Sequence, residues 1–259
     1  MPSELLTERH GAVLVLTLSD PASRNSLSHQ AIAAGIEALN VAESDPLIRT
    51  VVLRGDGAHF CAGGNLQGLQ ERRLAGPPAQ VQMIEHLHQF VEALHAFPKP
   101  VIAAVEGAAA GAGFSLALAC DLIVAAEDAR FILSHARLGL SPDGGATWSL
   151  AQALPRALAQ QLVWLAEPVS ARQLNQWGVV GWVTDNGQAL AEALRLAQRL
   201  AEMAPNALAS GKELVQQAGH RNLAQQLDAE RDHFIENLFN ANAGEGLQAF
   251  FDKRAPKFQ

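Results

Sequence analysis

Two glycine-rich turns, each preceded by a short apolar strand pattern, constrain the fold of this chain more than any other feature. The segment HFCAGGNL (59–66) comes after the pattern TVVLR (50–54), and EGAAAGAGF (106–114) comes directly after VIAAV (101–105). Small residues let main-chain N–H groups approach a ligand, and the second turn opens a helix whose N-terminus carries the positive end of its dipole. Two such donors converging on one carbonyl oxygen would form an oxyanion hole. A phosphate cradle and glycines needed only for turn geometry stay open as alternatives, although neither G-x-x-x-x-G-K-[ST] nor G-x-G-x-x-G occurs.

Strand and helix patterns alternate through the first two thirds of the chain. Short β-branched runs predict strands, and amphipathic stretches predict helices over 28–43, which Ser28 caps, and over 79–96. Strands that alternate with helices through short connections predict a parallel sheet covered on both faces, and hence an α/β fold. The predicted strands are 12–18, 50–54, 101–105, 122–126 and 130–133.

The C-terminal part of the chain has a different pattern. From about residue 189 only amphipathic helices are predicted, over 189–203, 206–217, 222–238 and 243–253. Separate amphipathic helices usually pack against something, often another subunit. We therefore predict an α/β core over residues 1–190 and a helical oligomerisation region over residues 191–259.

Composition excludes several classes of protein. A hydrophobic content of 49% with 17% charged residues excludes disorder. A net charge of −7 argues against a nucleic-acid partner, because phosphate contacts need clustered cations. Two cysteines make no disulfide framework and lack metal-ligand partners nearby, so no metal is expected. The longest apolar stretch is interrupted by charges and glycines, and the N-terminus does not resemble a signal peptide, so a cytoplasmic protein without a membrane segment is expected.

Short motifs follow one another in a fixed order along the chain. They are Asp20-Pro21 with Arg24-Asn25-Ser26-Leu27, FCAGGNL (60–66), PKPVIAAVEG (98–107), GAGFSLALACD (111–121), LGLSPDGG (138–145) and AFFDKR (249–254). An ordered set is far more specific than a single loop, and this one resembles the enoyl-CoA hydratase/isomerase (crotonase) superfamily over essentially the whole chain. The resemblance implies a crotonase-like spiral of ββα units with a C-terminal helical trimerisation region, and a homotrimer or dimer of trimers.

The resemblance also implies an acyl-CoA thioester substrate. Coenzyme A is then part of the substrate, and no separate cofactor is expected. By position, the two oxyanion-hole N–H groups of the family fall on Gly64 and Ala112. The coenzyme A path would be lined by Arg24, Leu27, Ala62, Gly63 and Leu66, and Phe234, Phe250 and Lys253 match tail positions that reach coenzyme A bound by a neighbouring subunit.

The type of reaction depends on three positions. Hydratases of the family use two glutamates, and this chain has Ser115 and His135 there, which argues against simple hydration because serine is a poor base. Asp143 lies in a segment (LGLSPDGGATW, 138–148) that resembles the phenylacetate-pathway isomerases, in which one carboxylate removes a proton and returns it elsewhere. We therefore expect an enoyl-CoA isomerase with Asp143 as proton shuttle. A helix N-cap is the structural alternative for Asp143.

Other functions remain open at this point. A hydratase-type lyase is one alternative. In aroyl-CoA dehalogenases an aspartate at the position of Asp143 attacks the ring, and His88 falls where a helping histidine would stand, although His135 replaces their active-site tryptophan. A non-catalytic acyl-CoA-binding protein is a further alternative. The acyl group is not identified; Ser115, His135, Trp148 and a predicted loop over 70–80 are candidates for tuning it.

Overall fold

The structure is a computed structural model that describes residues 3–259. Its larger sheet has the strand order β1-β2-β3-β4-β6-β9, antiparallel between β1 and β2 and parallel from β2 onward. The smaller sheet has the order β5-β7-β8. The larger sheet comprises β1 (Glu4–His10), β2 (Val13–Ser19), β3 (Thr50–Gly55), β4 (Val101–Val105), β6 (Leu122–Ala126) and β9 (Trp182–Thr184). The smaller one comprises β5 (Ala108–Ala110), β7 (Arg130–Ile132) and β8 (Val169–Ser170).

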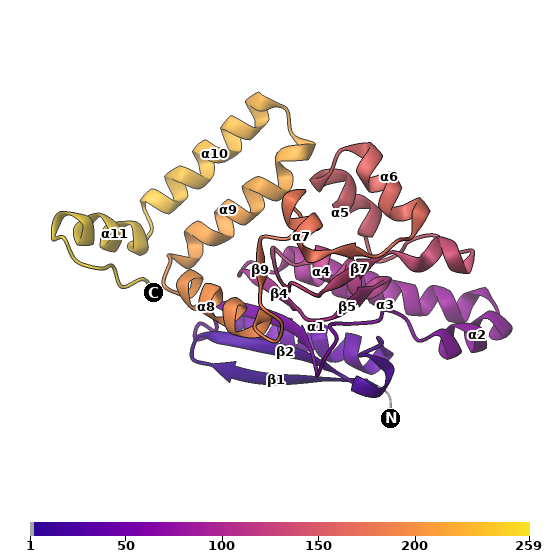
Figure 1. The fold of residues 1–259 in the computed structure, drawn as a ribbon. Coiled ribbons are helices and arrows are strands. Elements are labelled where there is room, and N and C mark those ends of the chain that lie inside the picture. Colours follow the sequence, from indigo (N-terminus) through magenta and orange to yellow (C-terminus); the bar gives the residue numbers. More distant parts are fainter. Residues whose placement is uncertain (1–2) are drawn as a thin grey trace.

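The helices cover both faces of the larger sheet, as Figure 1 shows. In the core they are α1 (His29–Ser44), α2 (Leu66–Ala75), α3 (Pro77–Ala96), α4 (Ala112–Ala119), α5 (Ala146–Ala153), α6 (Arg156–Leu165) and α7 (Ala171–Gln176). Toward the C-terminus follow α8 (Ala189–Ala201), α9 (Pro205–Gln217), α10 (Leu223–Leu238) and α11 (Ala241–Phe251).

The strands are apolar on both sides because both faces are buried. On β3, Val51 and Leu53 belong to the main core with α1 and α3, whereas Val52 belongs to a second core against α8. Side chains alternate between the faces of a strand, so a strand covered twice must be a continuous apolar run. This confirms the predicted parallel, doubly covered sheet.

Most helices begin and end within a few residues of the prediction. Ser28 caps α1, because its Oγ accepts a hydrogen bond from the N–H of Ala31 at 3.0 Å. One expectation was wrong: the segment 70–80 is not a loop but belongs to the α2–α3 hairpin, which turns at Gly76. Residues 4–10, for which no element was predicted, form β1, which has mixed polar and apolar residues because it is an exposed edge strand.

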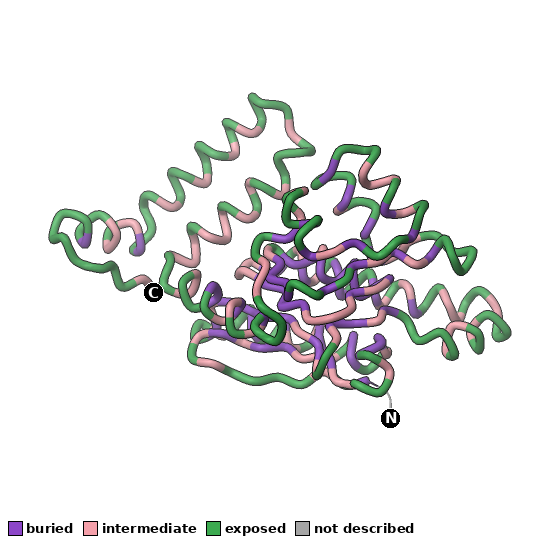
Figure 2. Tube along the Cα trace, in the orientation of Figure 1, coloured by how far each residue is buried: buried purple, intermediate pink, exposed green. Residues whose placement is uncertain are grey.

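The C-terminal helices α9 to α11 extend away from the sheets (Figure 1), and α9 and α10 contain no buried residue (Figure 2). Large apolar side chains are exposed on these helices and in the turn between α10 and α11: Val215, Leu223, Leu227, Phe234, Phe239, Phe250 and Phe251. By contrast α8 packs on β3, β4 and β6. The division of the chain at residue 190 stays a prediction. Within residues 3–259, no helix combines the length and the apolarity needed to cross a membrane.

Candidate active site

The two glycine-rich turns lie side by side. The N–H of Cys61 donates to the carbonyl of Ala108 at 3.1 Å, and the N–H of Ala110 donates to the carbonyl of Cys61 at 2.9 Å. The turns approach so closely that a Cβ on Gly63 would lie 2.5 Å from the oxygen of Ala110 and 3.0 Å from the nitrogen of Ala112. Gly63 also has φ +85°, a left-handed conformation that favours glycine. Glycine is therefore required here for the close approach as well as for the turn.

The main-chain N–H groups of Gly64 and Ala112 donate no hydrogen bond within residues 3–259. Ala112 is the first residue of α4, where the helix leaves its N–H groups without intrahelical acceptors. Both residues line one cavity of about 450 Å³. Two unpaired donors on one cavity wall, one of them at a helix N-terminus, can stabilise negative charge on a ligand oxygen.

The buried side chain of Asn25 holds the segment that leads into the first turn. This side chain is completely buried, and its Nδ2 donates to the carbonyls of Asp56 (2.9 Å) and His59 (2.7 Å). The N–H of Leu27 donates to the carbonyl of Gly63 at 2.8 Å. Burial raises the pKa of the adjacent Cys61 thiol to about 12, so Cys61 stays protonated near neutral pH and is no nucleophile.

Asp143 and His135 face each other in the same cavity. The Nε2 of His135 lies 3.3 Å from the Oδ1 of Asp143, which is within ion-pair distance. The angles between these two groups do not fit a hydrogen bond. Both Asp143 Oδ1 and His135 Nδ1 are buried without a hydrogen-bond partner in the described part of the chain. The N-cap interpretation of Asp143 was wrong, because Gly145 precedes α5 and no side chain caps that helix.

Ser115 lies behind the cavity rather than in its wall. It is 1% exposed, and its hydroxyl donates to the carbonyl of Asp143 at 2.9 Å. A Cβ on Gly144 would lie 2.9 Å from the Cβ of Ser115, so α4 and the turn carrying Asp143 are in contact. Ser115 therefore supports the turn that holds the carboxylate.

Comparison with known proteins shows the family to which the chain belongs. The model of the family described as "Enoyl-CoA hydratase/isomerase" matches residues 8–259. The chain belongs to the enoyl-CoA hydratase/isomerase family. Among relatives of this family, the 1,2-epoxyphenylacetyl-CoA isomerase of Escherichia coli K12 is 38% identical, over 98% of this chain and 97% of that protein. The 2,3-dehydroadipyl-CoA hydratase of the same organism is 37% identical over 99% of each chain.

A solved structure supports the fold assignment. A protein of Polaromonas sp. JS666 described as an enoyl-CoA hydratase is 55% identical and superposes with a TM-score of 0.97, over 99% of this chain and 100% of that chain. The predicted crotonase-like fold of the enoyl-CoA hydratase/isomerase family is thus confirmed.

The cavity collects most, but not all, of the residues predicted for an enoyl-CoA hydratase/isomerase site. Its wall includes Gly64, Ala112, His135, Asp143, His88, Leu27, Ala62 and Leu66. Gly63 is buried within the first turn and does not line the cavity, and Arg24 is exposed outside the cavity. The tail residues Phe234, Phe250 and Lys253 are exposed and line no part of this cavity. Whether these residues act on a substrate stays a prediction.

One wall of the cavity, which the α2–α3 hairpin forms, was not predicted from the sequence. Leu69 and Arg72 of α2, with Gln80, Met83, Ile84 and Leu87 of α3, line it. The residues of α3 lie at spacings of three and four, which places them on one face of a helix. That spacing was visible in the sequence, but it also fits ordinary core packing.

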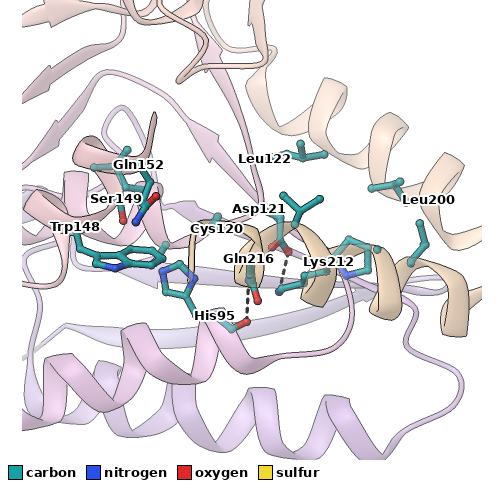
Figure 3. A pocket seen from close by; sticks show the side chains of 17 residues that line it. His95, Cys120, Asp121, Leu122, Trp148, Ser149, Gln152, Leu200, Lys212 and Gln216 are labelled. Atoms are coloured by element: carbon teal, nitrogen blue, oxygen red, sulfur yellow. Dashed lines mark hydrogen bonds and ion pairs between the residues drawn. The ribbon is translucent and has the colours of Figure 1, made fainter. Parts of the chain in front are cut away.

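A second, larger cavity of about 610 Å³ lies between the core and α9 (Figure 3). His95 and Trp148 face it, with ring centroids 5.4 Å apart, as do Asp121 and Lys212. Trp148, which sequence reasoning associated with the acyl group, lines this cavity instead of the one with Asp143. The expected role of Trp148 as an acyl-group determinant therefore has no support in this chain.

Proposed function

We propose that this protein is an enoyl-CoA isomerase, in which Asp143 moves a proton along the acyl group of a CoA thioester. One observation carries the proposal: the carboxylate of Asp143, whose side chain is 27% exposed, lines the same cavity as the unpaired N–H groups of Gly64 and Ala112. Base and oxyanion donors are the groups that a proton shift next to a thioester requires.

The proposed reaction has two proton transfers. The thioester oxygen accepts hydrogen bonds from Gly64 and Ala112, and Asp143 removes a proton from the α-carbon, which lies between that carbonyl and a β,γ double bond. The electron pair of the broken C–H bond moves into the acyl group, and the resulting dienolate oxygen is stabilised by the two donors. Asp143, now protonated, returns the proton at the γ-carbon, so that the carbonyl is restored and the double bond lies between the α- and β-carbons. One such donor contributes roughly 10² to 10³ in rate in other enzymes.

The composition of the cavity wall favours isomerisation over hydration. Asp143 is the one carboxylate among the residues lining the cavity within residues 3–259. Ser115, at a position where hydratases of the family are expected to have a glutamate, is buried and donates to a carbonyl. For a proton shift, a single carboxylate serves first as base and then as acid. Hydration by the two-glutamate mechanism of the family needs a second carboxylate, and the described residues of the cavity wall supply none.

Hydration is the second candidate, because the Polaromonas protein and one Escherichia coli relative are described as hydratases. Dehalogenation through Asp143 and His88 is a third, since both residues line the cavity. Product analysis separates the three. A panel of enoyl- and halobenzoyl-CoA thioesters read by mass spectrometry, NMR and halide release would give an isomer, a hydrate or free halide.

The test of the isomerase proposal is Asp143→Asn. We expect turnover to fall by roughly 10² to 10⁴, because the amide cannot accept the proton. Deuterium uptake from D₂O into the acyl chain should fall with it. Asp185→Asn, at an exposed position outside the cavity, is the matched control and should behave as wild type. Full isomerase turnover in Asp143→Asn would contradict the proposal, and acyl-CoA binding without turnover in the wild type would favour a binding protein.

We further propose a homotrimer or a dimer of trimers. The support is the exposed apolar surface of α9 to α11, which includes Phe234 and Phe250 and which one chain leaves uncovered. Exposed apolar patches of this kind are typical of interaction sites. Light scattering coupled to size-exclusion chromatography tests the assembly, and a monomer at micromolar concentration would contradict it.

A further inference from the structure

One cation lines the cavity of the candidate active site and has no partner of opposite charge. Arg72 is the sole lysine or arginine in the cavity wall within residues 3–259, and it is half-buried. It forms no ion pair with an acidic side chain in this part of the chain. A charge withdrawn from water without a counter-ion is costly, so a position of this kind favours an anionic ligand.

The guanidinium is held in place by its Nε alone. Arg72 Nε donates to Oε1 of Gln80, across the α2–α3 hairpin, at 2.7 Å. The side chain lies back along α2, since a Cβ on Gly68 would be 3.0 Å from an Nη atom of Arg72. The two Nη groups donate to no other group in the described residues. They form the planar two-pronged edge that binds a carboxylate with two parallel hydrogen bonds.

The position of Arg72 along the cavity suggests what this edge binds. Gln80, Met83 and Leu87 lie on the cavity face of α3, and a Cβ on Gly144, next to Asp143, would be 3.4 Å from Leu87. Gln80 is seven residues from Leu87, or roughly 10 Å along the helix. This face of α3 therefore runs from the neighbourhood of Asp143, through apolar side chains, to the guanidinium of Arg72.

We infer that Arg72 binds a carboxylate at the far end of the acyl group, so that the preferred substrates are CoA thioesters of medium-length dicarboxylic acids. The inference rests on the proposed function in one respect: Asp143 must face the acyl carbons, which makes the adjoining face of α3 the acyl side. The apolar side chains between the two ends suit the methylene groups of such an acyl chain. Gln80 is a positioning residue, because it acts on the ligand through Arg72.

A phosphate of coenzyme A offers similar anionic oxygens and is the other source of a ligand for Arg72. The two sources differ in one measurable respect. A terminal carboxylate is present only in dicarboxylic thioesters, whereas the phosphates are present in every CoA ligand. Binding of saturated thioesters separates them, and it does so without any turnover, so the result is independent of whether Asp143 is a proton shuttle.

The experiment is isothermal titration of the full-length protein with adipyl-CoA, hexanoyl-CoA and free coenzyme A. Suberyl-CoA with octanoyl-CoA forms a longer pair. The variants are Arg72→Leu, which removes the charge, and Arg72→Lys, which keeps the charge without the planar edge. Arg73→Leu is the matched control, because Arg73 is the exposed neighbour on α2 and does not line the cavity. Circular dichroism checks that each variant folds.

We expect the wild type to bind one of the dicarboxylic thioesters more tightly than its neutral counterpart. Arg72→Leu should weaken binding of that dicarboxylic thioester by roughly ten- to a hundredfold, as for other hydrogen bonds to charged groups, and leave binding of its neutral counterpart unchanged. Arg72→Lys should recover part of the affinity, and Arg73→Leu should match the wild type. A wild type with no preference for either dicarboxylic thioester would overturn the inference without any variant. Equal weakening of all ligands, free coenzyme A included, in Arg72→Leu would assign Arg72 to a phosphate and overturn it as well.

Discussion

The cavity between the core and α9 and the cavity with Asp143 differ in how their polar groups are paired. In the cavity between the core and α9, the carboxylate of Asp121 accepts hydrogen bonds from Val101 N–H (2.8 Å) and Lys212 Nζ (3.0 Å). Gln216 of α9 donates to the carbonyl of His95 at 3.1 Å (Figure 3). In the cavity with Asp143, within residues 3–259, that carboxylate accepts no hydrogen bond and has His135 Nε2 3.3 Å away, and the two Nη groups of Arg72 donate none.

The comparison shows that unpaired polar groups, more than volume, distinguish a candidate reaction site. The larger cavity measures about 610 Å³ and the one with Asp143 about 450 Å³. Buried polar groups are nearly always paired in folded proteins, so a concentration of unpaired ones needs a reason. In the first cavity the pairs tie α9 to the core and stabilise the fold. In the second, Asp143 and Arg72 line the cavity without such hydrogen-bonded pairs to charged groups among the described residues.

The largest effect we predict tests whether the close approach of the two turns matters for turnover. Gly63→Ala would place a Cβ 2.5 Å from the oxygen of Ala110 and push the turns apart. We expect turnover to fall at least about a hundredfold, because small displacements of catalytic groups are that costly. Gly11→Ala is the control, since Gly11 also has a positive φ, +62°, but has open space around it. Steady-state kinetics measure the effect, and similar turnover in both variants would remove the role assigned to the close approach.

The next effect tests whether the polar pairs in the cavity between the core and α9 stabilise the fold. Lys212→Met removes one partner of the ion pair with Asp121, whose side chains are 11% and 22% exposed. We expect the free energy of unfolding to fall by about 3 kcal/mol, since a largely buried carboxylate loses its partner. Turnover per folded molecule should stay unchanged.

Urea denaturation at fixed protein concentration measures this loss. Lys257→Met, at an exposed position, is the control. Asp121→Asn combined with Lys212→Met should recover part of the stability, because no buried charge then lacks a partner. A loss of turnover in folded Lys212→Met would mean that the two cavities are not as separate as we argue.

The smallest effect concerns acid stability. Burial, and then the nearby charge of Lys212, lower the pKa of His95 below its usual 6.5, with Asp121 opposing the shift. Because the unfolded chain then takes up the proton more readily, stability is complete above the unfolded pKa and is lost as the pH falls through the lowered folded pKa. His95→Gln should flatten this decline between about pH 7 and pH 5. Thermal melts across that interval measure it, with His10→Gln on the exposed edge strand as control; an unchanged profile in His95→Gln would contradict the argument.

Local patterns in the sequence predicted the elements that depend on local chemistry. Ser28 caps a helix through its own side chain, and the two glycine-rich turns were recognised because several small residues in a row favour tight turns. The pairing of the turns through Cys61 and Ala109 depends on contacts between distant segments, which spacing suggests but cannot prove. The α2–α3 hairpin was missed because Pro77-Pro78 and Gly76 are typical of loops as well as of helix ends.

The candidate site shows the same division. The motifs predicted which residues would line the cavity with Asp143, and the structure brings eight of them together. The partner of Arg72 could not be predicted, because Gln80 meets it only after the hairpin has formed. The contact between His135 and Asp143 also joins two segments whose relative position the sequence does not encode locally.

The hydrogen bond from Ser115 to the carbonyl of Asp143 has a consequence for the redesign of this scaffold. Introducing a carboxylate by Ser115→Glu would insert a larger side chain where Gly144 already touches the serine, and it would also break the support of the neighbouring turn. The carboxylate of Asp143 would be displaced by the same exchange that supplies a second carboxylate. Building a site with two carboxylates on this backbone therefore requires coordinated changes in two segments, α4 and the turn that carries Asp143.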